Sequence, residues 1–221
     1  MKKRTAVLIF RREASEEIRR KRFWDRSPVI SYLYKRTLRV AEATGFEVID
    51  HIDSGSAHPA QIQQRLTSTI ARAFETGMSR VLVIGTDCAT LSTEDLLQAS
   101  QSLQHHPTVL GPDQRGGAYL MGFNKAAFER HLFAKLPWGS ARFAEDFLRC
   151  FPKSVCQTQQ FDLNSPKELQ RLAKSTLRKK LLKPLIALIG THWELPFPVM
   201  KMADNIAYFH KPLRAPPMGQ R

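Results

Sequence analysis

At 221 residues the chain is long enough for one ordinary domain with an appendage and too short for two full-sized domains. A hydrophobic fraction of 43% and a charged fraction of 24% exclude a collagen-like, disordered or coiled-coil protein. Three cysteines without a CxxC pair favour reduced thiols over a secreted disulfide framework. Because the sequence has neither a signal-peptide core nor an apolar stretch of the roughly 20 residues that span a bilayer, we expect a globular, cytoplasmic protein.

The net charge of +14 is concentrated at the two ends of the chain. Residues 1–40 hold 13 basic and 4 acidic side chains, residues 167–221 hold 11 and 3, and the middle is mildly acidic. Basic ends can serve phosphorylated ligands, nucleic acid or anionic lipid, or can simply keep the protein soluble. Nucleic acid as a partner has no further support, because the basic ends lack interleaved aromatic residues and no reader motif is present.

Apolar runs alternate with amphipathic stretches from the start of the chain to its middle, and the run at 80–84 is the most apolar of all. This alternation predicts an α/β fold with a mainly parallel sheet, helices on both faces and ligands beyond the carboxyl ends of the strands. Strands are predicted at 5–10, 46–49, 80–84, 108–110, 118–123 and 154–163, and helices at 27–44, 59–76, 92–103, 125–135, 140–150 and from 165 onward.

Asp87 is the first candidate for a functional residue, because Gly85-Thr86-Asp87 directly follows the strongest strand. Gly85 would let a diphosphate approach the backbone. A carboxylate there is a hard oxygen ligand for Mg²⁺ or Mn²⁺, ions that proteins hold with one or two carboxylates plus substrate phosphates. The alternative is that Asp87 only caps a turn.

Two later segments are weaker candidates. Gly116-Gly117 precedes a strand and has neither Rossmann nor P-loop spacing, so the pair either faces a ligand or forms the tight turn of a β-hairpin. Asp162 and Asn164 follow the last predicted strand and, taken alone, suit a helix cap.

Together these segments resemble a largely uncharacterised bacterial family with the glycosyltransferase-A (GT-A) fold, related to nucleotide-diphospho-sugar transferases. The resemblance covers roughly residues 5–175 and implies a Rossmann-like three-layer α/β/α sandwich with a mixed sheet. It places Asp87 at the metal and diphosphate position, with Gly85 and Thr86 beside it, Asp162 and Asn164 near the same metal, and Arg115, Gly116, Gly117 and Tyr119 towards the sugar. The motifs that carry it are Gly-Thr-Asp-x-x-x-Leu (85–91), Leu-Gly-Pro with Gly-Gly-x-Tyr-Leu-Met-Gly (110–122), Leu-Pro-Trp-Gly (136–139) and Asp-Leu-Asn-Ser-Pro-Lys-Glu-Leu (162–169).

The chain departs from the family pattern at four places. Arg115 replaces an acidic residue, Asn164 replaces an aspartate, Ala89 replaces a proline, and a basic segment replaces the loop Pro-Gly-x-x-Lys-Thr-Arg-Leu after the first strand. Its basic side chains could bind phosphate directly through guanidinium forks, or could form surface ion pairs on a helix. They are Arg11, Arg12, Arg19, Arg20, Lys21 and Arg22.

The leading hypothesis is a glycosyltransferase that uses a nucleotide-diphospho-sugar and a divalent ion, Mg²⁺ or Mn²⁺, to neutralise the diphosphate leaving group. No base is identified, so the stereochemical outcome stays open. The alternatives are a nucleotidyltransferase, which lacks support because the Gly-rich triphosphate loop is absent, and a non-catalytic binding or scaffold protein on the same fold.

We expect the transferase domain to span residues 1–183 and a Pro-rich extension to span 184–221. The predicted helix from 165 onward carries leucines on one face and lysines and arginines on the rest. We expect it to dock on the sheet, with peripheral contact to an anionic membrane as the alternative.

Overall fold

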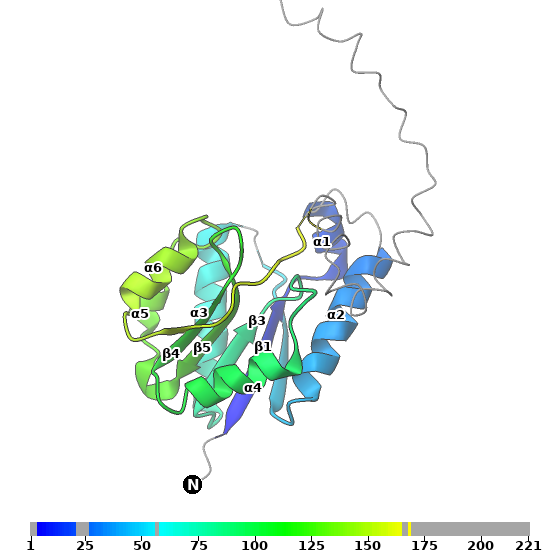
Figure 1. Cartoon of the computed structure of the whole chain (residues 1–221). Coiled ribbons are helices and arrows are strands. Elements are labelled where there is room, and N and C mark those ends of the chain that lie inside the picture. The colour runs from blue at the N-terminus through cyan, green and yellow to red at the C-terminus, as the bar shows by residue number, and fades with distance from the viewer. Residues whose placement is uncertain (1–3, 21–26, 56–57, 165–167, 169–221) are drawn as a thin grey trace, which may run out of the picture.

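Six strands form one mixed sheet in the order β2-β1-β3-β5-β4-β6 (Figure 1). The computed structural model describes residues 4–20, 27–55, 58–164 and 168. All neighbouring strands pair in parallel except that β5 runs antiparallel to both β3 and β4. The strands are β1 (Thr5–Arg11), β2 (Glu47–Ile52), β3 (Arg80–Ile84), β4 (Thr108–Pro112), β5 (Ala118–Asn124) and β6 (Val155–Cys156).

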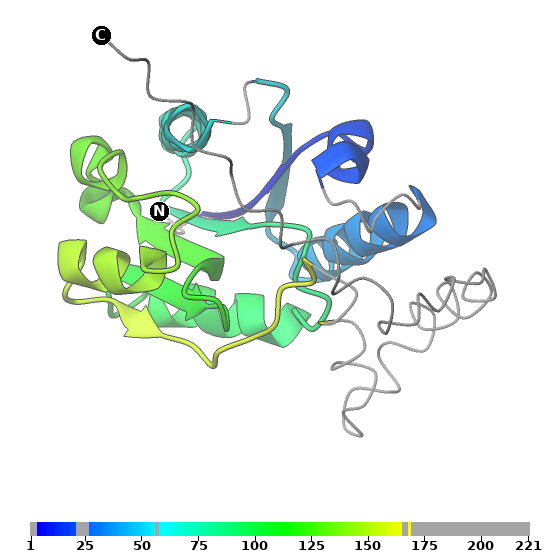
Figure 2. The same ribbon diagram turned by 90° about the horizontal axis from the view of Figure 1, so that it is seen from above.

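Helices cover both faces of the sheet, as the view from above shows (Figure 2). One face packs against α3 (Pro59–Glu75), α5 (Arg130–Phe133) and α6 (Phe143–Cys150). The opposite face packs against α2 (Ser27–Glu42) and α4 (Thr93–Ser102), and the short helix α1 (Ala14–Arg20) contacts α2. This arrangement confirms the expected three-layer α/β/α sandwich.

The alternation of side chains along β1 divides the core into two layers. Ala6 and Leu8 belong to the cluster on the α3 side, whereas Val7 and Ile9 belong to the cluster on the α2 and α4 side. All four residues are completely buried, as expected for a strand covered by helices on both faces.

Local sequence signals fix several of the boundaries. Ser92 forms the predicted capping box, since its hydroxyl accepts the Asp95 backbone N–H and the Asp95 carboxylate accepts the Ser92 N–H. Gly45 and Gly77 adopt φ of 71° and 95° just after α2 and α3, a backbone region that favours glycine.

The structure corrects two of the predicted helices. In place of one helix at 125–135 there is a 3₁₀ turn at Lys125–Ala127 and the single-turn helix α5, separated by extended Phe128 and Glu129. The centroids of the Phe128 and Phe123 rings lie 5.2 Å apart in the core, and this packing of Phe128 interrupts the helix. The helix predicted at 140–150 begins only at Phe143.

The strand predicted at 154–163 is also wrong in length, because only Val155 and Cys156 pair with β4. Residues 157–164 then leave the edge of the sheet and cross the carboxyl ends of its strands, and we call them the crossing segment. Single bridges join Gln160 to Asp113 and Asp162 to Cys88. In Figure 1 this yellow segment runs from the α6 side towards α1. The predicted helix from 165 onward and the proposed boundary at residue 183 lie outside the described residues. Within the part of the chain that is described, no helix is long and apolar enough to cross a membrane.

Candidate functional site

The loop after β3 carries Asp87 and is held in place from two sides. Arg36 on α2 donates a hydrogen bond from Nη2 to the Leu91 carbonyl at 2.6 Å, which fixes the end of the loop. The crossing segment contacts the same loop: the Leu163 N–H donates to the Asp87 carbonyl at 2.8 Å, and Cys88 bridges Asp162. Asp87 and Asp162 are therefore brought together by backbone contacts, although 74 residues lie between them in the sequence.

A cavity of about 200 Å³ opens at the carboxyl ends of β1 and β3, and we call it the first cavity. Asp87 and Asp162 both line it, together with Gly85, Thr86 and Tyr119. Seven of the residues that the sequence nominated therefore share one cavity, since Arg11 and Arg12 also line it. The remaining lining residues are Phe10, Glu17, Ile62, Leu66, Val83, Ile84, Cys88, Ala118, Met121 and Trp138.

A second cavity of about 360 Å³ lies next to the first, because Ala118 and Trp138 line both. Asn164 and Arg115 line this cavity and do not line the first. The other lining residues are Asp113, Gly117, Gly139, Ser140, Ala141 and Phe143.

Gly116 and Gly117 form the turn of the β4–β5 hairpin, which was one of the two interpretations of this pair. Gly116 has φ of 82°, and a Cβ there would collide with the Ala141 carbonyl oxygen. A Cβ at Gly117 would lie 2.5 Å from Oδ2 of Asp113. The two glycines therefore let the backbone of 140–142 and the Asp113 carboxylate approach the turn closely.

Tyr119 lines the first cavity, but its ring is almost fully buried. The hydroxyl donates to the Thr158 carbonyl at 3.1 Å, and the ring packs so closely on Gly111 that a Cβ there would lie 2.6 Å from it. Burial raises the pKa of the phenol. Tyr119 is thus a neutral wall of the cavity that anchors the crossing segment.

The Arg11 guanidinium is already paired with a neighbouring carboxylate. Its guanidinium donates two hydrogen bonds of 2.8 Å to the Asp50 carboxylate on β2 and lies 4.1 Å above the Tyr34 ring. Tyr34 also donates to Asp50, so this network joins β1, β2 and α2. Bidentate pairing leaves Arg11 little capacity for a phosphate.

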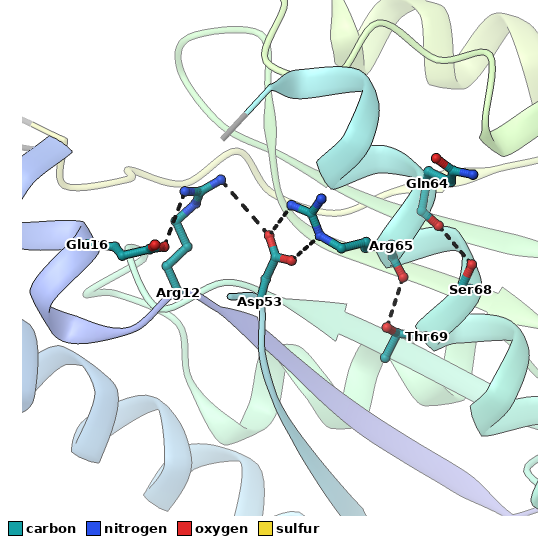
Figure 3. Close-up of polar contacts among 7 residues, drawn as sticks. All are labelled: Arg12, Glu16, Asp53, Gln64, Arg65, Ser68 and Thr69. Carbon is teal, nitrogen blue, oxygen red and sulfur yellow. Dashed lines mark hydrogen bonds and ion pairs between the residues drawn. The ribbon is translucent and has the colours of Figure 1, made fainter. Parts of the chain in front are cut away.

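Arg12 is held between Glu16 and Asp53 (Figure 3). Nη1 lies 3.5 Å from a Glu16 oxygen and Nη2 lies 4.0 Å from an Asp53 oxygen, and Nη2 makes no hydrogen bond within the described part of the chain. Asp53 is 1% exposed and accepts two hydrogen bonds from Arg65 on α3. The Arg12 side chain is itself only 9% exposed. Arg20 ends α1, and Lys21 and Arg22 lie outside the described residues.

Three residues of this region were not singled out from the sequence: Asp53, Arg65 and Asp113. Asp53 directly follows β2 and Asp113 directly follows β4, so the signal was present, since acidic residues at strand ends meet at one edge of a parallel sheet. Arg65 gave no such signal, because it lies in the middle of an amphipathic helix. No group of three or more His, Cys, Asp or Glu side chains suited to a metal ion occurs among the residues that the structure describes.

Comparison with known proteins supports the fold. Residues 34–140 match a family described as an uncharacterized protein conserved in bacteria (DUF2064). The expected resemblance to a largely uncharacterised bacterial family with a GT-A-like fold is confirmed. The match begins within α2, after β1 and the basic segment that follows it. No curated protein matches the sequence significantly.

Three solved structures share the architecture. A proposed nucleotide-diphospho-sugar transferase from Desulfovibrio desulfuricans G20 has a TM-score of 0.70 at 19% identity, covering 86% of this chain and 98% of its own. Rv0371c from Mycobacterium tuberculosis H37Rv has a TM-score of 0.51 at 12% identity, covering 79% and 100%. The 4-diphosphocytidyl-2C-methyl-D-erythritol synthase from Anaerococcus prevotii DSM 20548 has a TM-score of 0.50 at 11% identity, covering 76% and 94%. At these identities the likeness establishes the fold alone.

We predict that replacing Asp50 with asparagine destabilises the protein by about 1 kcal/mol near neutral pH and has little effect in acid. Arg11 lowers the pKa of Asp50, so the carboxylate stabilises the fold above the unfolded-state pKa of about 4, and this contribution is lost as the pH falls through the lower folded-state value. Urea unfolding at neutral and acidic pH measures the difference. Glu47→Gln, which removes an exposed ion pair on the same strand, serves as the control. An equal loss of stability for Asp50→Asn at both pH values would contradict the electrostatic explanation.

We also predict that iodoacetamide alkylates Cys156 in the native protein while Cys88 remains protected. Burial raises the pKa of the Cys88 thiol to about 12, and the thiol lies 3.3 Å from the Gln160 amide oxygen, whereas Cys156 is exposed. Since the thiolate is the nucleophile, Cys88 should react only after unfolding in urea. Peptide mass spectrometry distinguishes the two sites, and equal native reactivity would show that the wall of the first cavity opens.

Proposed function

We propose that this protein transfers a glycosyl group from a nucleotide-diphospho-sugar and that the first cavity holds the diphosphate with a divalent ion. The observation that supports this proposal most directly is the convergence of Asp87 and Asp162 on one cavity at the carboxyl ends of β1 and β3. In open α/β sheets this is where phosphorylated ligands bind. The fold shared with the Desulfovibrio protein is compatible with the same class of substrate.

The chemistry of the lining residues suits Mg²⁺ or Mn²⁺. Three carboxylates and two arginines line the first cavity, and each arginine already lies beside a carboxylate of its own. A diphosphate entering this set of described residues therefore requires an additional cation. Asp87 and Asp162 would hold the ion as two hard oxygen ligands, with phosphate oxygens completing its coordination.

When bound, the divalent ion neutralises charge on the diphosphate leaving group. The protein's own groups orient the donor around it. Gly85 is exposed at the start of the loop, and a Cβ there would meet no other atom within 4 Å, so the backbone is open to a phosphate. Arg12 lines the same cavity and adds a positive charge close to the phosphate.

We predict that Asp87→Asn weakens metal-dependent binding of nucleoside diphosphates at least 10-fold without changing the fold. The substitution removes the charged oxygen ligand but leaves the backbone carbonyl that accepts the Leu163 N–H. A thermal-shift screen of nucleoside diphosphates and nucleotide sugars, with and without Mn²⁺, measures the effect, because ligands of the native state raise its stability. Asp146→Asn, which changes a half-buried carboxylate on α6 that lines neither cavity, is the matched control. Nucleotide binding that is independent of metal, or absent, would instead favour a non-catalytic binding protein.

A second prediction concerns Arg12. Arg12→Gln should weaken the binding of a nucleoside diphosphate about 10-fold or more and leave the binding of the corresponding nucleoside unchanged, because only the diphosphate is attracted by the charge of the guanidinium. Isothermal titration calorimetry compares the two ligands, with Arg130→Gln as an exposed control. An equal loss for both ligands would show that Arg12 maintains the shape of the cavity and does not bind phosphate.

A further inference from the structure

The second cavity contains a carboxylate that the first cavity does not use. Asp113 is 7% exposed and lines the second cavity at the β4–β5 turn. Its Oδ1 accepts the backbone N–H groups of Arg115 and Gly117 at 2.6 and 2.8 Å. Its Oδ2 accepts no hydrogen bond from any residue that the structure describes. One oxygen is therefore fixed by the turn, and the other retains its capacity to accept a hydrogen bond.

The position of the second cavity suits the second substrate of a transfer reaction. Trp138 and Ala118 line both cavities, so a molecule in the second cavity lies beside a donor bound in the first. Transfer requires the two reactants to be held in contact in a defined orientation. Neighbouring cavities that share two lining residues place the two reactants side by side.

The lining of the second cavity favours a neutral, hydroxyl-bearing ligand such as a sugar. Trp138 and Phe143 provide apolar ring surfaces, and Asp113, Ser140 and Asn164 provide a carboxylate, a hydroxyl and an amide. The only positive side chain among the lining residues in the described chain is Arg115, which lies 3.7 Å from Glu168. Because Glu168 offsets the charge of Arg115 and Asp113 is a carboxylate, the binding of an anionic ligand is disfavoured.

We infer that the second cavity binds a neutral sugar or polyol acceptor and that Asp113 is the base that activates its hydroxyl. The acceptor hydroxyl gives its proton to Oδ2 of Asp113 while its oxygen forms a bond to the anomeric carbon of the donor. The bond from that carbon to the diphosphate oxygen breaks, and the electron pair leaves with the diphosphate. Asp113 then releases the proton to water. This inference rests on the proposed function, whose donor it requires.

The variant that tests it is Asp113→Asn. The asparagine carbonyl still accepts both backbone N–H groups and so preserves the turn, while its NH₂ group replaces the oxygen that would accept the proton. Alanine would remove the hydrogen bonds of the turn as well and could not separate the two roles. Asp146→Asn on α6 is again the matched control.

Two measurements are made with the nucleotide that stabilises the protein most in the thermal-shift screen. The first is the rate at which the protein releases nucleoside diphosphate from a nucleotide sugar that contains this nucleotide. The acceptors are water and the methyl glycosides of glucose, galactose, mannose and N-acetylglucosamine. The second is saturation-transfer NMR of the same methyl glycosides on protein loaded with the nucleoside diphosphate and Mg²⁺.

We expect Asp113→Asn to lower the release rate by about 100- to 10,000-fold, to leave the KM for the nucleotide sugar within about 2-fold, and to weaken the glycoside signal. The control should resemble the wild type. Weaker binding of the nucleotide sugar with unchanged binding of the nucleoside diphosphate would overturn the inference, because the donor's own sugar would then occupy the second cavity. A variant that behaves like the control, or a wild type with neither turnover nor glycoside contact, would also overturn it. Normal metal-dependent nucleotide binding in these cases would leave the proposed function standing.

Discussion

The reversed direction of β5 is the constraint on which both cavities depend. Because β5 pairs antiparallel with β3 and with β4, β4 runs in the same direction as β3. The end of β4 and the start of β5 therefore lie at the same edge as the carboxyl ends of β1 and β3. This places the hairpin turn beside the loop that carries Asp87, and Ala118 at the start of β5 borders both cavities.

The crossing segment supplies further lining residues to both cavities. After two residues of pairing with β4 it runs along the carboxyl edge, bridging Asp113 through Gln160 and Cys88 through Asp162. Residues at its beginning hold the Tyr119 hydroxyl, and residues at its end deliver Asp162 to one cavity and Asn164 to the other. A single stretch of irregular backbone thus distributes its polar side chains between two neighbouring sites.

The arginines that line the first cavity are paired with neighbouring carboxylates. A buried carboxylate such as Asp53 is stable only with a partner, and Arg65 and Arg12 supply the compensating charge. Two of the six basic side chains of the basic segment are paired in this way, since Arg11 is bound to Asp50 and Arg12 lies between two acids. The two arginines that line the first cavity therefore have their charge offset by neighbouring carboxylates.

The sequence by itself determined the α/β class, the central strand at 80–84 and the capping box at Ser92, because these depend on local hydrophobic periodicity and on contacts within four residues. It also indicated Asp87, since a strand end of this kind marks the ligand edge of the sheet. Only the tertiary structure decided that Asp162 lines the same cavity as Asp87, that Arg11 is paired with Asp50, and that Asp113 and Asn164 line the neighbouring cavity together. Each of these depends on which distant segments meet across the sheet, and that arrangement follows from strand order and from the reversal of β5, which no local pattern encodes.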